Sequence, residues 1–354
     1  MSQSFFKKFI TDLGDADTAL AADGTSSAEF GKFIDTGSYV LNAALCGDMF
    51  GGFPDNKALV LAGESTTGKT FFALSLVRNF LEQYKDGQVF YFDTESAITN
   101  DMLTGRGIDP ERIAKSEPDS IEKFRTVAVR ALDKYLEIPE EKRFPMLMVL
   151  DSLSALPSKK ETEDIANEKD ARDMTKSQLI KGAFRVLRLK LAKAKVPLIV
   201  TNHVYAVIGA YVPTKEMSGG SGAKYAADTI AFLSKSKEKD SDKKVIGNIV
   251  KVRMVKSRMT KEETVIHTRI LFDGGLDRYY GLLDYGQQAG LIKRVGNKYE
   301  FPNGTKAFEA AVIANPEKYF TQDILEQVNA HMKEQFLYTG EAPVDVSELE
   351  EVAE

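Results

Sequence analysis

The sequence has a single cysteine, Cys46, among its 354 residues. One cysteine excludes an internal disulfide framework, and there is no second cysteine to suggest a thiolate metal site. We therefore expect the protein to work in a reducing, cytoplasmic compartment.

Long apolar stretches and a strong charge imbalance are also missing. Residues 1–10 lack the extended apolar run of a signal peptide, and the longest apolar runs, such as Met146 to Leu150, have the length of strands. We expect no targeting segment and no membrane span. The net charge of −5 does not exclude an anionic partner, because charge can be clustered. With 43% hydrophobic residues, the chain can bury one large core and a smaller domain.

The most specific motif is a phosphate-binding loop. It fits G-x-x-x-x-G-K-[ST] and lies between an apolar strand pattern, Ala58 to Ala62, and a helical pattern, Lys69 to Tyr84. The glycines let backbone N–H groups converge on phosphate oxygens at a helix N-terminus. We expect Lys69 to reach the β- and γ-phosphates of ATP and Thr70 to ligate Mg²⁺. The expected cofactor-binding residues of this loop are Gly63, Glu64, Ser65, Thr66, Thr67, Gly68, Lys69, Thr70 and Phe71.

Two later strand patterns end in acidic residues. The first, Val89 to Phe92, is followed by Asp93-Thr94-Glu95, and the second, Met146 to Leu150, by Asp151. In a parallel sheet these ends lie at the same edge as the phosphate-binding loop. Glu95 is therefore a candidate general base, and Asp151 is a candidate Walker B residue that holds Mg²⁺ through water and through Thr70.

A third strand pattern, Pro197 to Thr201, ends in Asn202-His203 and precedes a glycine-bearing loop at residues 204–222. The helical segment before it, Gln178 to Ala194, carries basic residues and no acid, and the usual explanation is a solvated face. Its basic residues are Lys181, Arg185, Arg188, Lys190 and Lys193.

The N-terminal segment has an apolar stripe at helical spacing over Ser4 to Leu13, but it is too short to fold alone. A polar stretch, Gly14 to Ser27, follows and is typical of a flexible connector. Two interpretations stay open: an arm that reaches a neighbouring subunit, and a helix that packs on its own core.

The order of these motifs resembles the RecA recombinase family: the P-loop, Asp-x-Glu, an apolar run with Asp-Ser, then Asn-His and a Gly-Gly loop. The resemblance extends from about residue 34 to residue 336. Several stretches look most like the UvsX branch of that family, the recombinases of tailed phages. These stretches are Thr36-Gly37-Ser38, residues 158–164 with Asn167-Glu168-Lys169, Lys256-Ser257-Arg258, and residues 272–277.

The resemblance implies roles for individual residues. Glu95 matches the family's catalytic glutamate, which polarises the water that attacks the γ-phosphate. His203 occupies the sensor position and can donate to the γ-phosphate, with a core histidine as the alternative. Lys256 and Arg258 match two cations that reach the ATP of the adjacent protomer in the filament. The family's adenine-stacking tyrosine falls near Met102, which offers apolar contact without a ring.

The same resemblance assigns residues 158–172 and 204–222 to two DNA-binding loops that stay mobile until DNA orders them. The DNA contacts expected in these loops are Lys159, Lys160, Lys169, Arg172, Tyr205, Tyr211, Lys215, Gly219 and Gly220.

The C-terminal part begins with a helical pattern, Gly281 to Ile292, and a hairpin pattern, Lys293 to Lys306. Helical patterns at Ala307 to Ala314 and Thr321 to Phe336 complete a small domain. Residues 341–354 contain six acids and no base, which is typical of a disordered acidic tail. This tail either competes with DNA for a basic surface or only aids solubility.

We expect an α/β fold: a RecA-type P-loop core with a mostly parallel central sheet, a short N-terminal arm and a small α+β C-terminal domain. The expected boundaries are residues 1–30 for an oligomerisation arm, 31–277 for the ATPase core, 278–340 for the C-terminal domain and 341–354 for the tail.

The expected function is that of a DNA-dependent ATPase that forms an ATP-bound filament on single-stranded DNA and pairs that strand with homologous duplex. Single-strand-binding and mediator proteins are further expected partners, and the compartment is the host cytoplasm if a phage encodes the chain. One alternative is a hexameric helicase, which normally has a separate domain before this core. The other is a catalytically idle, ATP-clamped mediator, which the presence of Lys69, Glu95, Asp151 and the Lys256/Arg258 pair disfavours.

Overall fold

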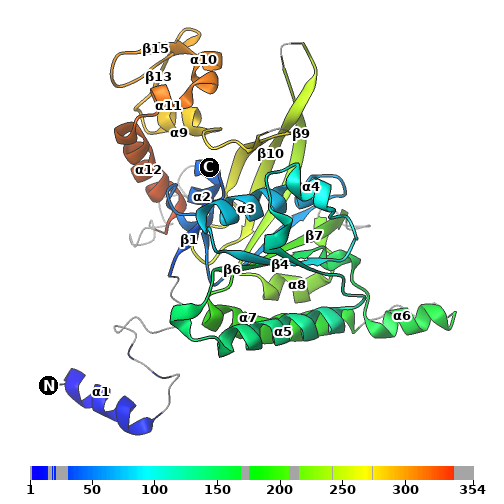
Figure 1. Ribbon diagram of the computed structural model, residues 1–354. Helices are drawn as coiled ribbons and strands as arrows, with labels where there is room; N and C mark the ends of the chain where they lie inside the picture. Colours follow the sequence, from blue (N-terminus) through cyan, green and yellow to red (C-terminus); the bar gives the residue numbers. More distant parts are fainter. Residues whose placement is uncertain are drawn as a thin grey trace, which may run out of the picture.

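The structure is a computed structural model that describes residues 2–14, 18, 20, 31–168, 175–206, 215–240, 242–272 and 274–338. A large β-sheet runs through these residues, with helices on both of its faces (Figure 1). The expected α/β fold with a mostly parallel central sheet is confirmed. No helix in the described ranges combines the length and the apolar character needed to cross a membrane.

The parallel part of the sheet consists of β3 (Ala58–Gly63), β4 (Gln88–Asp93), β5 (Ile113–Ser116), β6 (Met146–Asp151), β7 (Leu198–Ala206) and β9 (Thr229–Lys239). Antiparallel strands continue it: β10 (Val245–Lys256), β11 (Val265–Leu271) and β12 (Gly275–Leu276). The order is β12-β11-β10-β9-β3-β7-β6-β4-β5, and β8 (Lys215–Met217) pairs with β7 outside this path. The carboxyl ends of β3, β7, β6 and β4 therefore lie side by side at one edge.

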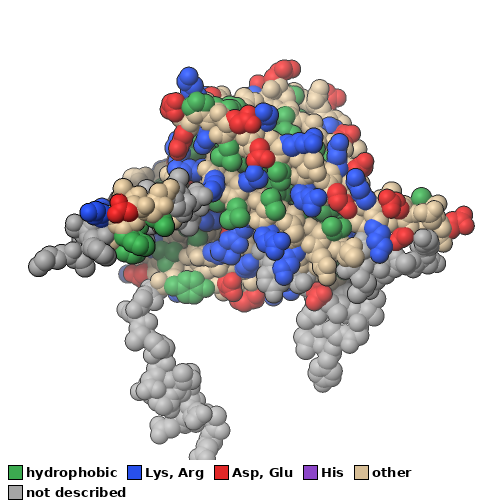
Figure 2. Space-filling view, turned by 90° about the horizontal axis from the view of Figure 1, so that it is seen from below, with side chains coloured by type: hydrophobic (Ala, Val, Ile, Leu, Met, Phe, Trp, Pro, Cys, Tyr) green, Lys and Arg blue, Asp and Glu red, His purple; other side chains and the backbone are tan. Residues whose placement is uncertain are grey.

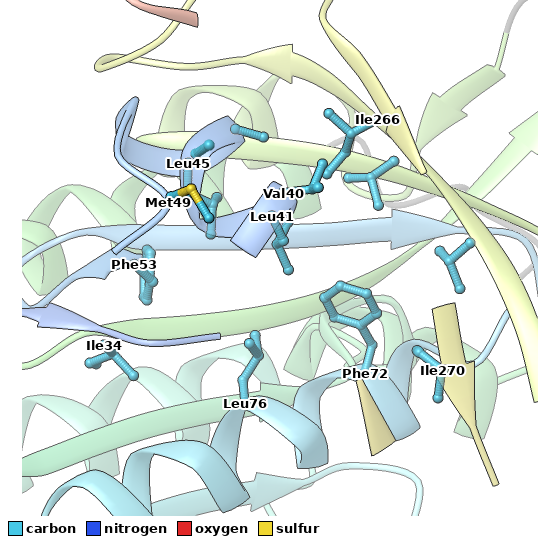
Figure 3. Packing of buried hydrophobic residues seen from close by; sticks show 14 of the residues in the cluster. Ile34, Val40, Leu41, Leu45, Met49, Phe53, Phe72, Leu76, Ile266 and Ile270 are labelled. Carbon is cyan, nitrogen blue, oxygen red and sulfur yellow. The ribbon is translucent and has the colours of Figure 1, made fainter. Parts of the chain in front are cut away.

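Helices α2 (Tyr39–Cys46) and α3 (Lys69–Gln83) cover one face of the sheet, and α5 (Ile121–Glu137) and α7 (Lys176–Ala194) cover the other (Figure 1). Strands β3 and β6 are buried along their whole length, as expected for parallel strands between two helical layers. Phe72 and Leu76 of α3 lie in one apolar cluster with Val40 and Leu41 of α2 (Figure 3). The helix predicted from the pattern at Lys69 to Tyr84 is thus confirmed, and it has an apolar stripe on its buried side.

Shorter elements connect these layers and build the C-terminal region. The connecting elements are β1 (Phe33–Ile34), β2 (Phe53–Pro54), α4 (Asn100–Thr104), α6 (Lys159–Ala166), α8 (Gly220–Ala226) and 3₁₀ turns at Pro110–Arg112, Glu140–Lys142 and Leu153–Ala155. The C-terminal elements are α9 (Leu282–Gln288), β13 (Lys293–Val295), β14 (Lys298–Glu300), β15 (Lys306–Phe308), α10 (Glu309–Ala314), α11 (Pro316–Tyr319) and α12 (Gln322–Phe336).

The C-terminal elements share the core of the sheet domain. Phe336 of α12 is fully buried, and its backbone oxygen accepts a hydrogen bond from Lys261 N at 2.8 Å. Asn329 Oδ1 of the same helix accepts from Met49 N at 2.8 Å. One continuous apolar cluster includes residues of both α2 and α12. The C-terminal region therefore packs firmly against the α2 side of the sheet.

The N-terminal segment forms α1 (Ser2–Leu13), as its periodicity predicts. Its apolar side chains stay exposed, with Phe6, Phe9 and Leu13 each more than half accessible. Figure 1 shows α1 apart from the other described helices. The apolar stripe is therefore uncovered in a single chain.

Three predicted boundaries were wrong. The loop expected from Val204 starts later, because β7 continues to Ala206 and pairs with β8. The segment assigned to the first DNA-binding loop begins as helix α6, because Ser158 and Glu161 form a capping box at its start. The helix expected from Ala307 starts at Glu309, because Ala307 pairs with β14 as part of a strand.

Candidate functional site

Two glycines shape the phosphate-binding loop between β3 and α3. Gly63 ends β3 in register with His203 of β7 and Leu233 of β9. A Cβ atom on Gly63 would come within 2.7 Å of Thr67 Oγ1 and 2.9 Å of the Leu233 carbonyl oxygen, so no side chain fits there. Gly68 precedes α3 with a φ of 89°, a left-handed conformation that favours glycine. The loop therefore takes its shape from the residues that the P-loop pattern requires.

Lys69, the first residue of α3, is a buried cation inside this loop. Its Nζ donates to the carbonyl oxygens of Gly63 at 3.0 Å and Glu64 at 2.8 Å. Burial lowers the pKa of Lys69, while the carboxylates of Glu95 and Asp151 oppose that shift. The ammonium group thus lies where the loop would surround a phosphate.

His203 connects Lys69 to Glu95. Nδ1 of His203 lies 3.4 Å from Lys69 Nζ, and its Nε2 lies 3.6 Å from Glu95 Oε1. Because an ammonium group only donates, Nδ1 must accept, and the proton of the neutral ring then sits on Nε2, facing the carboxylate. The structure therefore brings together three residues that the sequence suggested separately.

Glu95 is oriented by Ser152, which directly follows β6, and lies on a turn that Asp93 of β4 shapes. Ser152 Oγ donates to Glu95 Oε1 at 2.6 Å and lies 2.8 Å from Ser154 Oγ. Asp93, buried at the end of β4, accepts from the backbone N–H groups of Ala97 at 3.1 Å and Ile98 at 3.0 Å. Asp93 therefore shapes the turn, while Glu95 stays 42% exposed at its tip. Sequence reasoning missed Ser152, although it directly follows the Walker B aspartate.

Asp151 ends β6 directly beside Asp93 of β4 in the strand register. Its Oδ2 accepts from the Tyr91 hydroxyl at 2.8 Å, and its Oδ1 accepts from Thr201 Oγ1. Burial, together with the Asp151 charge, raises the pKa of Tyr91 well above its usual value. These hydroxyl groups hold the carboxylate in place at the sheet edge.

The donor chemistry at this edge suits Mg²⁺ in the manner of P-loop proteins. In the described part of the chain, no three His, Cys, Asp or Glu side chains converge to hold a metal ion by themselves. Such a site needs the Thr70 hydroxyl on the first turn of α3, water held by Asp151, and phosphate oxygens. The residues present fit an ion that binds together with a nucleotide.

A cavity of about 190 Å³ lies beside α3. Phe71, Arg106 and Phe272 are among its lining residues, and the Arg106 guanidinium lies 4.9 Å from the centre of the Phe71 ring. Met102, the predicted adenine contact, is not one of them; its carbonyl oxygen accepts from Arg106 Nη1 at 3.1 Å. The half-exposed ring of Phe272 was missed by sequence reasoning.

A larger cavity of about 260 Å³ opens at the other edge of the sheet, beside Tyr84 and Lys195. It lies away from the phosphate-binding loop and the acidic strand ends.

Lys256 and Arg258 do not approach the phosphate-binding loop of their own chain. Arg258 Nε lies 3.2 Å from Oδ1 of Asp228, at the start of β9. Gly63 of the phosphate-binding loop pairs with Leu233, five residues after Asp228 in the sequence. Five residues of strand separate Asp228 from Leu233 by roughly 17 Å. Lys256 Nζ donates to the carbonyl oxygens of Lys224 at 2.9 Å and Ala227 at 2.7 Å. Burial and the nearby Arg258 charge lower its pKa.

The predicted DNA contacts that the structure describes lie on four elements. Lys159 and Lys160 are exposed at the start of α6, which projects from the body of the protein (Figure 1). Tyr205 is 60% exposed on the extension of β7, and its ring lies 6.5 Å from that of His203. Lys215 begins β8, and Gly219 and Gly220 lie at the start of α8 with positive φ angles. The remaining predicted contacts lie outside the described residues: Lys169, Arg172 and Tyr211.

Positive charge gathers on the face formed by α5 and α7 (Figure 2). Two cations of α7 form ion pairs: Arg188 with Asp228 at 3.0 Å, and Lys190 with Asp133. The expected solvated face therefore does not describe these two residues. A net charge of −5 therefore coexists with a basic face. Its exposed cations are Lys123, Arg130, Lys134, Lys181, Arg185 and Lys193.

Comparisons with known proteins agree with this architecture. The family model of the RecA N-terminal domain matches residues 8–277. A recombination and repair protein of Enterobacteria phage T4 is 35% identical over 280 residues, which covers 78% of this chain and 70% of the relative. Protein RecA of a Nocardioides species is 28% identical over 276 residues, covering 76% and 73% of the two chains. Protein RecA of Bacteroides thetaiotaomicron is 26% identical over 302 residues, covering 83% and 86%.

Proposed function

Because the chain belongs to the RecA family, we infer that it is a DNA-dependent ATPase that carries out DNA strand exchange in recombination, repair and recombination-dependent replication. Protomers with bound ATP assemble as a helical filament on single-stranded DNA and pair that strand with a homologous duplex. The observation that carries this proposal is the meeting of Lys69, His203 and Glu95 at the phosphate-binding loop.

In this proposal the phosphate-binding loop, residues 63–70, holds the ATP phosphates through backbone N–H groups and Lys69. Thr70 and Asp151 would hold Mg²⁺, which supplies charge neutralisation of the phosphates when it is bound. The cavity beside α3 suits the base, since Phe71 and Phe272 offer aromatic contact where Met102 offers none.

Hydrolysis needs a water molecule that is oriented towards the γ-phosphate. Glu95 is suited to accept a proton from that water, and Ser152 and Asp93 keep its carboxylate at the sheet edge. The Nε2–H group of His203 faces Glu95, and it can turn to donate to a γ-phosphate oxygen in the manner of a sensor. Loss of the γ-phosphate would then change the position of His203 on β7, the strand that also carries Tyr205.

Lys256 and Arg258 complete the site of a neighbouring protomer. Their place at the far edge of the sheet supports this assignment, because neither side chain can span the separation from its own phosphate-binding loop. Spread negative charge in phosphoryl transfer is stabilised by such cations. Hydrolysis therefore depends on assembly.

DNA binding is assigned to the segments at residues 158–172 and 204–222. Basic side chains there neutralise phosphates, and exposed Tyr205 offers a surface on which a base can stack. The proposed organisation keeps residues 1–30 as an oligomerisation arm, 31–277 as the ATPase core, 278–340 as the C-terminal domain and 341–354 as an acidic tail. Single-strand-binding and mediator proteins are proposed partners, and the host cytoplasm is the proposed compartment.

A DNA-stimulated ATPase assay combined with electron microscopy tests the function. We expect ATP turnover that rises with single-stranded DNA, together with extended helical filaments and pairing of homologous strands. Closed rings without filaments would instead indicate a helicase. Filament formation without turnover would indicate a mediator that uses ATP as a clamp.

A further inference from the structure

Asp228 is a buried carboxylate between β3, α7 and the strand-end segment that carries Arg258. Its backbone N–H donates to the Ala58 carbonyl oxygen at 3.0 Å, and its Oδ2 accepts from the Ala58 N–H at 3.0 Å. These reciprocal bonds fix the carboxylate at the start of two adjacent parallel strands. The side chain therefore has one orientation, set by the backbone of the sheet.

The other oxygen of Asp228 faces two guanidinium groups. Oδ1 lies 3.0 Å from Arg188 Nη2 and 3.2 Å from Arg258 Nε. Neither approach has hydrogen-bond geometry, so the contacts are ionic and can adjust when Arg258 moves. A buried carboxylate requires such compensation, because an unpaired charge is costly in the interior.

Arg258 meets Asp228 through the edge of its guanidinium group that carries Nε. Contact through Nε leaves the two terminal amino groups of a guanidinium available for a bidentate phosphate contact. The side chain is 49% exposed, so that end can reach another chain. This is the geometry of a cation held at its base and presented at its tip.

Helix α8 connects this carboxylate to the second proposed DNA-binding segment. It begins at Gly220, within that segment, and the chain reaches Asp228 two residues after the helix ends. Lys256 Nζ binds the carbonyl oxygens of Lys224 and Ala227, at the end of the same helix. Gly222 N donates to Ser177 Oγ of α7 at 3.3 Å, which ties the helix to the layer below. Both cations are thus anchored within residues 224–228.

We infer that Asp228 is a positioning residue for hydrolysis in the neighbouring protomer: it holds Arg258 by its Nε edge so that the terminal amino groups meet the neighbour's phosphates. The inference rests on the proposed function of Arg258 as a cation shared between protomers. It also separates the supports of the two cations, since Lys256 binds carbonyl oxygens at the end of α8, whereas Arg258 is held by the sheet through Asp228.

The experiment uses filaments assembled from two variants. The acceptor chain carries Lys256→Ala and Arg258→Ala and keeps its phosphate-binding loop. The donor chain carries Lys69→Ala and keeps its cations. Each alone should lack DNA-stimulated turnover, and the mixture should recover part of it. No recovery despite demonstrated co-assembly would overturn the shared site itself, and the inference with it.

Given recovery, Asp228→Asn is added to one chain at a time. In the donor we expect it to lower kcat of the mixed filament about tenfold with little change in KM for ATP, because ATP binds to the acceptor. In the acceptor, which has no Arg258, the loss should be much smaller. Equal losses of kcat in the two chains would show that Asp228 only stabilises the fold. No loss in the donor would show that Arg258 works without Asp228. Either result overturns the inference and leaves the shared site intact.

Two further variants guard against a trivial result. Asp277→Asn in the donor is the matched control, because Asp277 also pairs with a buried guanidinium, that of Arg269, but far from the cations. It should not produce a loss specific to the donor. The Asp228→Asn chain could fail to fold because a neutral amide then lies beside two arginines, and thermal unfolding would reveal this. In that case the double variant Asp228→Asn and Arg188→Met, which keeps the charge balance, is used with the same expected results.

Discussion

Nζ of Lys69 lies 3.4 Å from Nδ1 of His203, so the lysine of the phosphate-binding loop contacts the histidine of the neighbouring strand. The two residues are 134 positions apart in the sequence, and the pairing of β3 with β7 brings them together. A phosphate that binds Lys69 would replace contacts to the Gly63 and Glu64 carbonyl oxygens and to this ring. We therefore expect nucleotide binding and the position of His203 to be coupled through the ammonium group of Lys69.

Replacing Lys69 by alanine should weaken ATP binding about 100-fold and abolish DNA-stimulated turnover. The variant loses a charge-assisted contact to the phosphates inside a partly desolvated loop. Fluorescent nucleotide titration measures the affinity. Lys85→Ala, at an exposed position, is the matched control and should bind ATP as the unmodified protein does. Normal turnover by the Lys69 variant would contradict the P-loop assignment.

Glu95→Gln should retain ATP and DNA binding and lose hydrolysis. The amide keeps the shape of the carboxylate, and it can still accept from Ser152, but it is not basic. Filaments formed with ATP should persist longer, as seen by electron microscopy, and Glu326→Gln on the surface of α12 should behave normally. Ordinary turnover in the Glu95 variant would show that another residue activates water.

Ser152→Ala should lower kcat about tenfold and leave ATP affinity unchanged. The hydroxyl group of Ser152 holds one oxygen of Glu95, and a hydrogen bond to a charged group contributes about 1.5 kcal/mol. Ser154→Ala is the control, because its hydroxyl contacts Ser152 and not Glu95. Steady-state ATPase kinetics distinguish the two variants; equal effects would mean that Glu95 does not depend on Ser152.

Deleting residues 341–354 should tighten binding to single-stranded DNA about fivefold at low salt, with a smaller gain as salt rises. The segment carries six acids and no base, which would compete for the basic face over α5 and α7. A chain of the same length with these acids changed to Gln or Asn separates charge from length. Unchanged affinity at low salt in both would leave the tail as an aid to solubility.

Cys46 should react with a thiol reagent about 100-fold more slowly in the folded protein than in urea. The side chain is buried, and burial raises the pKa of its thiol above the usual value. A raised pKa means less thiolate at pH 8, and thiolate is the reactive form. Absorbance after addition of a disulfide reagent measures the rate. Rapid reaction without denaturant would show that the α2 region opens readily.

The sequence by itself was sufficient for the features that local chemistry specifies. The spacing of Gly63, Gly68 and Lys69 predicts a phosphate-binding loop, because backbone turns and helix N-termini depend on neighbouring residues. The apolar stripe of α3 and the all-apolar run of β6 predict their elements for the same reason. The order of the strand-end residues was enough to suggest the family and the edge of the sheet at which they meet.

Only the tertiary structure decided contacts between distant segments. Ser152 reaches Glu95 across 57 positions, Phe272 joins Phe71 in a cavity, and Asp228 bonds to Ala58 across 170 positions. None of these pairs has a local sequence pattern, because strand order and register determine which distant residues meet. The boundaries of β7 and β15 were wrong for a related reason: pairing with a neighbouring strand extended both beyond their apolar runs. Strand pairing also explains why Lys256 and Arg258 lie far from their own phosphate-binding loop. Strand β10 is antiparallel to β9, so it returns the chain to the opposite edge of the sheet.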